Sequence, residues 1–196
     1  MKKINRIFIQ SICIFLIASI AHFVYSIFPY DFIGVFFPVN ESLFEHLKMI
    51  YTSFFIFYFL LFVLKKPLGY QNIFFSMLIN SITTIILFDI IYIPIYYRYG
   101  ENLLLTFIIL FVSIFVTQYL YFFILLKKDY KKLEILSIII ISLIFIILGY
   151  LTFEPLPYDF FYDPISEGYG IRSEPFWWMF RCFCQCKHRF FLFLLF

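Results

Sequence analysis

Five long apolar runs alternate with short polar stretches along the chain, and they set the first expectation about its fold. The runs are Ile7–Phe28, Met49–Leu64, Ile73–Tyr96, Leu103–Leu126 and Ile135–Phe153. Most approach the ~20 residues that a helix needs to cross a ~30 Å hydrocarbon core, and Leu43–Leu47 can extend the shorter second run. None shows the period of two that is typical of a membrane β-barrel. The pattern predicts an all-α integral membrane helical bundle with about five transmembrane helices.

Composition strengthens this interpretation and excludes one class of partner. Hydrophobic residues make up 64% of the 196 residues, and the mean hydropathy is +0.96. Soluble domains average only ~45–50% apolar residues, so we expect the lipid bilayer to surround this chain. With 32 Phe and only six Gly, the helices are expected to pack through large side chains. The basic residues form short clusters between apolar runs and no extended basic face, which argues against nucleic acid as a partner.

Lysine and arginine are distributed unevenly between the predicted loops. With a cytoplasmic N-terminus, the cytoplasmic side receives Lys2, Lys3, Arg6, Lys65, Lys66, Lys127, Lys128, Lys131 and Lys132, and the outside receives Lys48, Arg98 and Arg172 before the tail. This asymmetry predicts that the N-terminus is cytoplasmic. The small residues of Ala18–Ala21 would also suit a cleavable signal peptide, but the apolar run continues to Phe28, which favours a retained helix.

The domain organisation follows from these runs. Residues 1–174 are predicted to form a single five-helix transmembrane domain, and residues 175–196 an aromatic, Cys-rich tail. Charges in the tail at Arg181, Lys187 and Arg189 argue against a sixth crossing and favour an interfacial segment. The tail also carries Cys182, Cys184, Cys186 and His188. Their alternate spacing differs from the usual two-residue gap of a closed zinc site, which disfavours metal binding there.

The densest polar cluster is Pro38–Lys48, directly before the second apolar run. On a helix, Glu41, Glu45 and Lys48 would share one face, and His46 would point about a quarter turn away. Ser42 and Glu45 have the spacing of a capping box, which would explain them by helix initiation alone. That architecture does not explain His46, which beside a carboxylate could carry a proton or bind a metal. Both interpretations remain open.

Two ionisable residues lie inside the predicted spans. His22 and Asp89 are six and seven residues from the outer ends of their runs, which places both about 10 Å below the external surface. A carboxylate at this depth is either functional or held by a structural contact, for which Tyr92 and Tyr96 are candidates. Arg98 lies in an aromatic stretch that suits anchoring at the interface.

The last external segment, 154–171, carries prolines and glycines at spacings that predict a turn-rich loop, either a lid over the helix ends or a plain connector. The chain has no His-Glu-x-x-His, no Gly-x-Ser-x-Gly and no phosphate-binding glycine loop. The sequence therefore identifies no catalytic residue and no cofactor, and it leaves enzymatic activity uncertain.

Several of these features together carry a resemblance. They are Pro38–Lys48, His22 upstream of it, Asp89 ahead of Tyr96, and the closing Asp163–Ile171. The chain resembles a family of uncharacterised bacterial multi-pass membrane proteins with a Pro-Val-Asn-Glu-Ser…Glu-His-Leu-Lys signature, classed as a domain of unknown function. The similarity covers roughly residues 7–171 and implies a bacterial cytoplasmic membrane location but no activity. The tail departs from the pattern, as a lineage-specific addition or a reading-frame artefact, so its cysteines are left out of any predicted site.

Two functional hypotheses and a structural alternative follow. The first is a polar pocket open to the outside that binds or transports a cation, a proton or a small polar solute. Its candidate residues are His22, Asn40, Glu41, Glu45, His46, Lys48, Asp89 and Arg98, of which Glu45, His46 and Asp89 are candidate metal ligands. The second is a membrane enzyme in which His46 or Asp89 is the base and Lys48 or Arg98 holds a lipid phosphate. A structural scaffold is the third, and the sequence specifies neither ligand nor oligomeric state.

Overall fold

The part of the chain that the structure describes contains six α-helices, one short 3₁₀-helix and a small hairpin. The computed structural model describes residues 2–64, 72–100, 102–125 and 131–171, so the tail predicted to be interfacial lies outside it. The helices are α1 (Lys2–Ile27), α2 (Asp31–Phe36), α3 (Leu43–Val63), α4 (Ile73–Tyr99), α5 (Leu103–Leu125) and α6 (Lys131–Phe153). All except α2 are long and apolar enough to cross a membrane, which confirms the predicted all-α bundle with five spans. The second span begins at Leu43, as its extension by Leu43–Leu47 anticipated.

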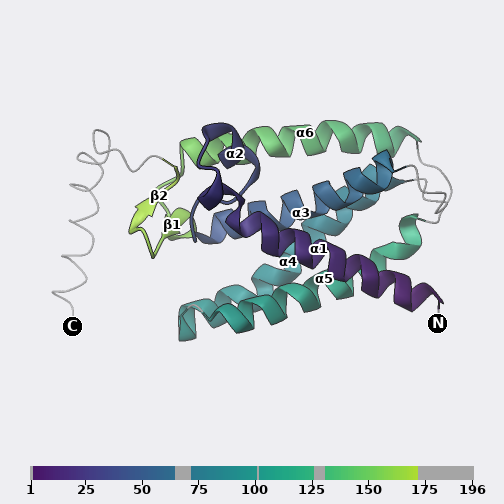
Figure 1. The fold of residues 1–196 in the computed structure, drawn as a ribbon, viewed down its shortest axis with the longest axis horizontal. Coiled ribbons are helices and arrows are strands. Elements are labelled where there is room, and N and C mark those ends of the chain that lie inside the picture. The colour runs from purple at the N-terminus through teal and green to yellow at the C-terminus, as the bar shows by residue number, and fades with distance from the viewer. Residues whose placement is uncertain (1, 65–71, 101, 126–130, 172–196) are drawn as a thin grey trace.

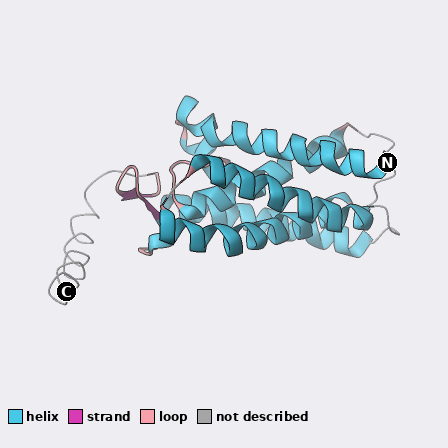
Figure 2. Ribbon diagram, turned by 90° about the horizontal axis from the view of Figure 1, so that it is seen from below, coloured by secondary structure: helices cyan, strands magenta, loops and turns pink. Residues whose placement is uncertain are grey.

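Four of the long helices close a ring. Helix α1 packs against α3 and α5, and α4 packs against the same two helices from the other side. Helix α6 lies outside this ring, where it contacts α4 and the short helix α2 (Figures 1 and 2). The N-terminus lies at one end of the bundle, and α2 and the hairpin lie at the other (Figure 1).

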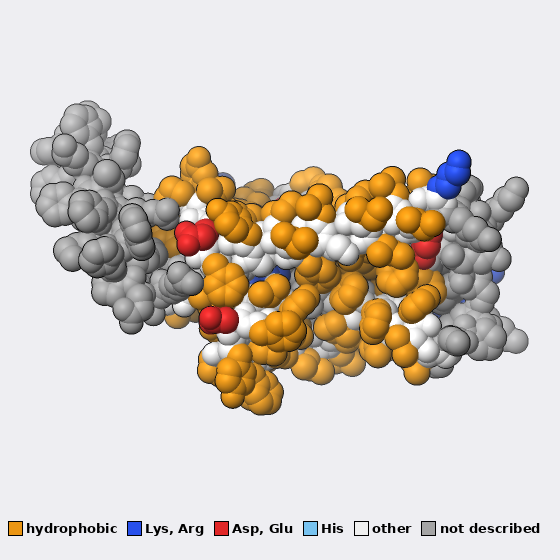
Figure 3. Space-filling view, turned by 90° about the horizontal axis from the view of Figure 1, so that it is seen from above, with side chains coloured by type: hydrophobic (Ala, Val, Ile, Leu, Met, Phe, Trp, Pro, Cys, Tyr) orange, Lys and Arg blue, Asp and Glu red, His pale blue; other side chains and the backbone are white. Residues whose placement is uncertain are grey.

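Large apolar side chains fill the ring and also cover the outside of the bundle. Ile14, Phe54, Phe88, Leu110 and Ile114 are all at most 1% exposed and come from all four ring helices. On the face shown in Figure 3, hydrophobic side chains extend along the length of the bundle, and acidic groups lie near its ends. An apolar outer belt of this kind is stable in lipid, whereas in water it would remain exposed.

Helix starts are fixed by specific caps. The Ser42 hydroxyl accepts a hydrogen bond from the Glu45 backbone N–H at 3.4 Å, which confirms the capping half of the predicted box. The reciprocal half is different: Asn40 Oδ1 accepts from the Ser42 N–H at 3.0 Å, and Glu45 reaches further back, to the N–H of Val39. The N-terminus of α4 is capped by Glu134 of α6, whose carboxylate accepts from the N–H groups of Phe74 and Phe75.

The segment after α6 folds back over the end of the bundle. It contains η1 (Asp159–Phe161) and a hairpin of β1 (Tyr162–Asp163) and β2 (Gly168–Tyr169), in agreement with the turn-rich loop predicted there. The end of this segment is held against the end of α6, because the Ile171 N–H donates to the carbonyl of Thr152 at 3.2 Å. Gly170 has φ +62°, and a Cβ there would lie 2.5 Å from the Thr152 carbonyl oxygen. The close approach of this segment to the end of α6 therefore requires glycine at position 170.

Candidate functional site

Two histidines and one carboxylate converge at the end of the bundle opposite the N-terminus. His22 is in the last turns of α1, Glu41 is in the loop before α3, and His46 is in the first turn of α3. Glu41 Oε2 lies 3.4 Å from His22 Nε2 and 3.7 Å from His46 Nε2. One ligand-type atom from each of the three residues lies within 4.8 Å of the others. We call these three residues the His–Glu–His cluster.

Local hydrogen bonds explain why Glu41 faces back toward α1. The chain leaves α1, forms α2 and returns through 37–42. There Glu45 Oε2 accepts from the Val39 N–H at 3.1 Å, and Asn40 Oδ1 accepts from the Ser42 N–H at 3.0 Å. Glu41 is therefore held between anchored residues on both sides. It lies before the N-cap, so it does not share the helix face of Glu45 and Lys48 that the spacing predicted.

The tautomer of His46 follows from its backbone contact. Its Nδ1 lies 3.0 Å from the Ser42 carbonyl oxygen, which can only accept a hydrogen bond. Nδ1 therefore carries a proton, and in the neutral imidazole Nε2 directs a lone pair toward Glu41. A histidine whose other ring nitrogen donates to a backbone carbonyl is the usual arrangement of a metal ligand.

The cluster is enclosed on one side and open on the other. The His46 side chain is 8% exposed, that of His22 is 14% exposed and that of Glu41 is 27% exposed, so access increases toward Glu41. Aromatic rings pack against the imidazoles: Phe23 stacks on His22 at 5.1 Å, and Tyr92 lies 6.4 Å from His46 between ring centroids.

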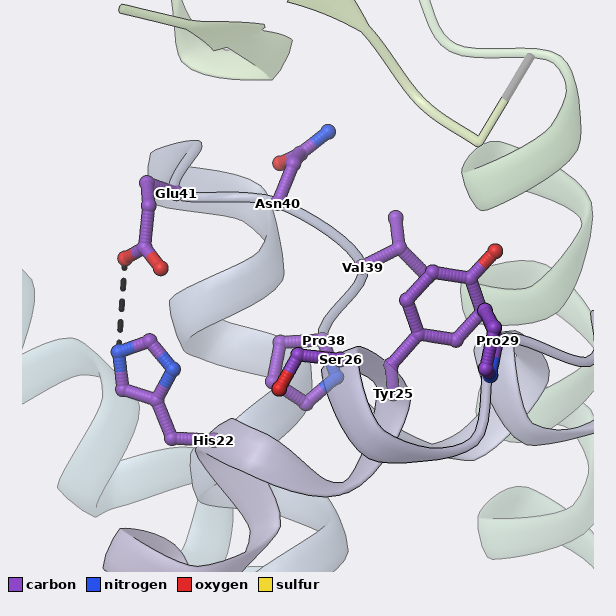
Figure 4. A pocket seen from close by; sticks show the side chains of 8 residues that line it. All are labelled: His22, Tyr25, Ser26, Pro29, Pro38, Val39, Asn40 and Glu41. Atoms are coloured by element: carbon purple, nitrogen blue, oxygen red, sulfur yellow. Dashed lines mark ion pairs between the residues drawn. The ribbon is translucent and has the colours of Figure 1, made fainter. Parts of the chain in front are cut away.

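A pocket adjoins the open side of the cluster. It has a volume of about 240 Å³ and is lined by His22, Tyr25, Ser26, Pro29, Pro38, Val39, Asn40 and Glu41. Figure 4 shows the His22 imidazole and the Glu41 carboxylate facing one another at one edge of this pocket, with Ser26 and Pro38 beside them and Tyr25 and Pro29 beyond. Any group bound between His22 and Glu41 would therefore be reachable from the pocket.

The donor set of the cluster matches one class of ion. Two imidazole nitrogens and one carboxylate oxygen are ligands of zinc and of neighbouring divalent transition metals, whereas calcium and magnesium prefer oxygen alone. Zinc sites with three protein ligands of this composition keep a further position for water or a substrate. The arrangement can thus hold a transition-metal ion with one coordination position open.

The other polar residues of the Pro38–Lys48 cluster form a separate, buried network. Lys48 Nζ lies 2.6 Å from Glu45 Oε2 and donates to the Gly34 carbonyl at 2.7 Å and to Thr152 Oγ1 at 2.8 Å. All three ammonium protons thereby have an acceptor. The network connects α2, α3 and α6, and it leaves the Lys48 ammonium enclosed, away from any lipid phosphate.

Asp89 and Arg98 are not members of the His–Glu–His cluster. Asp89 is half-buried on α4 and is not part of the group of metal-ligand atoms. Tyr92 and Tyr96, the residues considered as its partners from the sequence, contact one another with ring centroids 5.7 Å apart. Arg98 is exposed in the last turn of α4, where its guanidinium lies 5.7 Å from the Tyr99 ring centroid. Asn40 lies on the pocket wall, and its amide donates to the Gly170 carbonyl at 3.4 Å.

Two residues of the buried network were not anticipated from sequence. Gly34 and Thr152 supply acceptors for Lys48 from α2 and α6. A glycine in a short apolar stretch and a threonine at the end of an apolar run carry no pattern that would single them out. Only the packing of α2 between α3 and α6 gives them a polar partner.

Comparison with known proteins places the chain in a family without assigning it an activity. No curated protein and no solved structure matches it. A family model does match, and it spans residues 1–171, most of the chain and all of the described helices. The chain therefore belongs to this family, which is described as a family of unknown function (DUF6512).

Proposed function

We propose that this chain is a multi-pass membrane protein that binds a divalent transition-metal cation, with zinc as the type case, at the His–Glu–His cluster. The observation that carries this proposal is the convergence of three ligand atoms within 4.8 Å from two helices and a loop. The Ser42 carbonyl supports it further, because it fixes the His46 tautomer that can bind a metal through Nε2.

The bundle would present this site to the outside of the cytoplasmic membrane of a bacterial cell. Lys3 and Arg6 lie at the N-terminal end of α1, and the cluster lies at the opposite end of the same helix. Basic residues mark the cytoplasmic side of a membrane protein, so the uneven distribution of Lys and Arg favours an outward-facing cluster. The family resemblance noted from the sequence supports the bacterial membrane.

Titration of the purified full-length chain with Zn²⁺ by calorimetry tests the proposal. The background should carry Cys182→Ser, Cys184→Ser and Cys186→Ser, so that tail thiols cannot bind the metal. We expect one Zn²⁺ per chain. Separate His22→Gln, Glu41→Gln and His46→Gln changes should each weaken binding by more than the about 10- to 100-fold that loss of an outer-shell partner costs.

Glu154→Gln is the matched control, because Glu154 is an exposed carboxylate at the same end of the bundle and outside the cluster. It should bind Zn²⁺ with the affinity of the parent chain. Equal affinities in the parent and in His46→Gln would contradict the proposal, as would the absence of any saturable binding.

A further inference from the structure

The pocket beside the His–Glu–His cluster has a composition that suits a particular kind of second ligand. We infer that the pocket binds a small monocarboxylate whose carboxylate oxygen occupies the open coordination position of the metal. This inference rests on the proposed function, because it requires the metal to be bound. It goes further by assigning the pocket a ligand class.

Position is the first argument. His22 and Glu41 both contribute to the pocket wall, so the metal they would share lies at the pocket edge. His46 is not among the lining residues and approaches the cluster from the protein interior, where its side chain is 8% exposed. A metal held by these three residues would therefore have its remaining coordination position accessible from the pocket.

Charge is the second argument. Two neutral imidazoles and the Glu41 carboxylate leave a divalent ion with a net charge of one positive unit. Of the residues that line the pocket, only His22, Tyr25 and Glu41 are ionisable, so the pocket supplies no second carboxylate to neutralise the ion. A monoanion would balance this charge in a partly enclosed place, where an unbalanced charge is unfavourable.

The remaining wall argues for a short apolar body on that anion. Pro29, Pro38 and Val39 present apolar surface, and Ser26 and Asn40 add polar groups around it. The Ser26 hydroxyl already donates to the Phe23 carbonyl at 2.7 Å, so toward the pocket it can only accept. The volume of about 240 Å³ is below the ~300–1,000 Å³ of sites for drug-sized ligands. A short-chain carboxylate is therefore the size and polarity that fits.

Visible absorption of the Co²⁺-loaded full-length chain tests this inference, because cobalt spectra report the ligands of the ion. The tail cysteines are again replaced by Ser. Butyrate should change the spectrum saturably, whereas the uncharged butyramide at equal concentration should leave it unchanged. Ser26→Trp would fill the pocket, since Ser26 borders it without contributing a metal ligand (Figure 4). This variant should keep its Co²⁺ affinity and lose the response to butyrate.

The outcomes separate the two proposals. A chain that binds Co²⁺ but whose spectrum does not respond to butyrate overturns the pocket assignment and leaves the metal site standing. An undiminished butyrate response in Ser26→Trp also overturns it, because the anion would then reach the metal by another route. Failure of the parent chain to bind Co²⁺ overturns the metal site and the pocket ligand together.

Discussion

Glu45 and Lys48 form an ion pair inside the protein, with Oε2 and Nζ 2.6 Å apart and side chains 1% and 0% exposed. Only four residues before Glu45, the Glu41 carboxylate instead contacts His22, with Oε2 and Nε2 3.4 Å apart. The two carboxylates of one short segment therefore have different roles. Glu45 holds α3 to its neighbours through Lys48, and Glu41 contacts the two histidines that we propose as metal ligands.

Removal of the positive charge of Lys48 from this ion pair should destabilise the bundle. Lys48→Met leaves the Glu45 carboxylate buried without its partner, which typically costs about 3–5 kcal/mol. The double variant Glu45→Gln with Lys48→Met removes both charges and should recover a large part of that loss. Unfolding in detergent, followed by circular dichroism during an SDS titration, measures both effects. Equal stability of Lys48→Met and the parent chain would show that the pair contributes nothing.

The cap between helices provides a second prediction. Glu134 of α6 accepts hydrogen bonds from the N–H groups of Phe74 and Phe75, at 2.8 and 2.9 Å, in the first turn of α4. Glu134→Ala leaves both donors without this partner and should lower stability by about 1–2 kcal/mol, the usual loss for a helix cap. The same SDS titration applies. The exposed Glu154→Gln serves as control, and an equal effect of both changes would mean that the cap is unimportant.

Two glycines of the closing hairpin form a matched pair. At Gly170, φ is +62° and a Cβ would lie 2.5 Å from the Thr152 carbonyl oxygen, whereas at Gly168 the nearest atoms would be 3.7 Å away. Gly170→Ala should therefore destabilise the segment by about 1–3 kcal/mol, and Gly168→Ala should have a much smaller effect. Limited proteolysis between 154 and 171 compares them directly. Similar cleavage rates for the two variants would contradict the close packing of Gly170 against the Thr152 carbonyl.

The five spans could be predicted because each depends only on local composition and length. The start of α3 was also accessible, since Ser42 carries a capping signal in its own neighbourhood. The His–Glu–His cluster was harder to predict from sequence, because its two histidines are 24 positions apart. They come together only because the chain turns back through α2 and residues 37–42. The sequence pattern predicted a depth for His22 and a polar segment around Glu41 and His46, but it did not predict that the three side chains converge.

Asp89 shows that sequence position alone does not predict the direction of a side chain around its helix. Its distance from the end of its run placed it at the depth of His22, but depth does not specify which way a side chain faces around the helix axis. In the structure Asp89 is half-buried on α4 and outside the cluster. The same reasoning explains Glu45, whose helical spacing from Glu41 suggested a shared face. The helix begins after Glu41, so that spacing does not apply.

Orientation in the membrane gives a prediction that does not depend on any ligand. In a background with all four cysteines replaced by Ser, Ile165→Cys lies in the hairpin with 69% exposure, and Lys132→Cys lies in the exposed first turn of α6. A membrane-impermeant maleimide applied to intact cells should label position 165 and spare position 132 until the cells are lysed. The reverse pattern would place the cluster on the cytoplasmic side.

X-ray absorption spectroscopy of the Zn²⁺-loaded full-length chain, with its natural cysteines, tests the metal site most directly because it reads the donor atoms themselves. The cluster predicts a first shell of nitrogen and oxygen at about 2.0–2.2 Å, with the outer-shell scattering of two imidazoles. His46→Gln should reduce that imidazole signal. A shell dominated by sulfur at about 2.3 Å would assign the metal to cysteine. That result, or a shell without imidazole, would contradict binding by His22, Glu41 and His46.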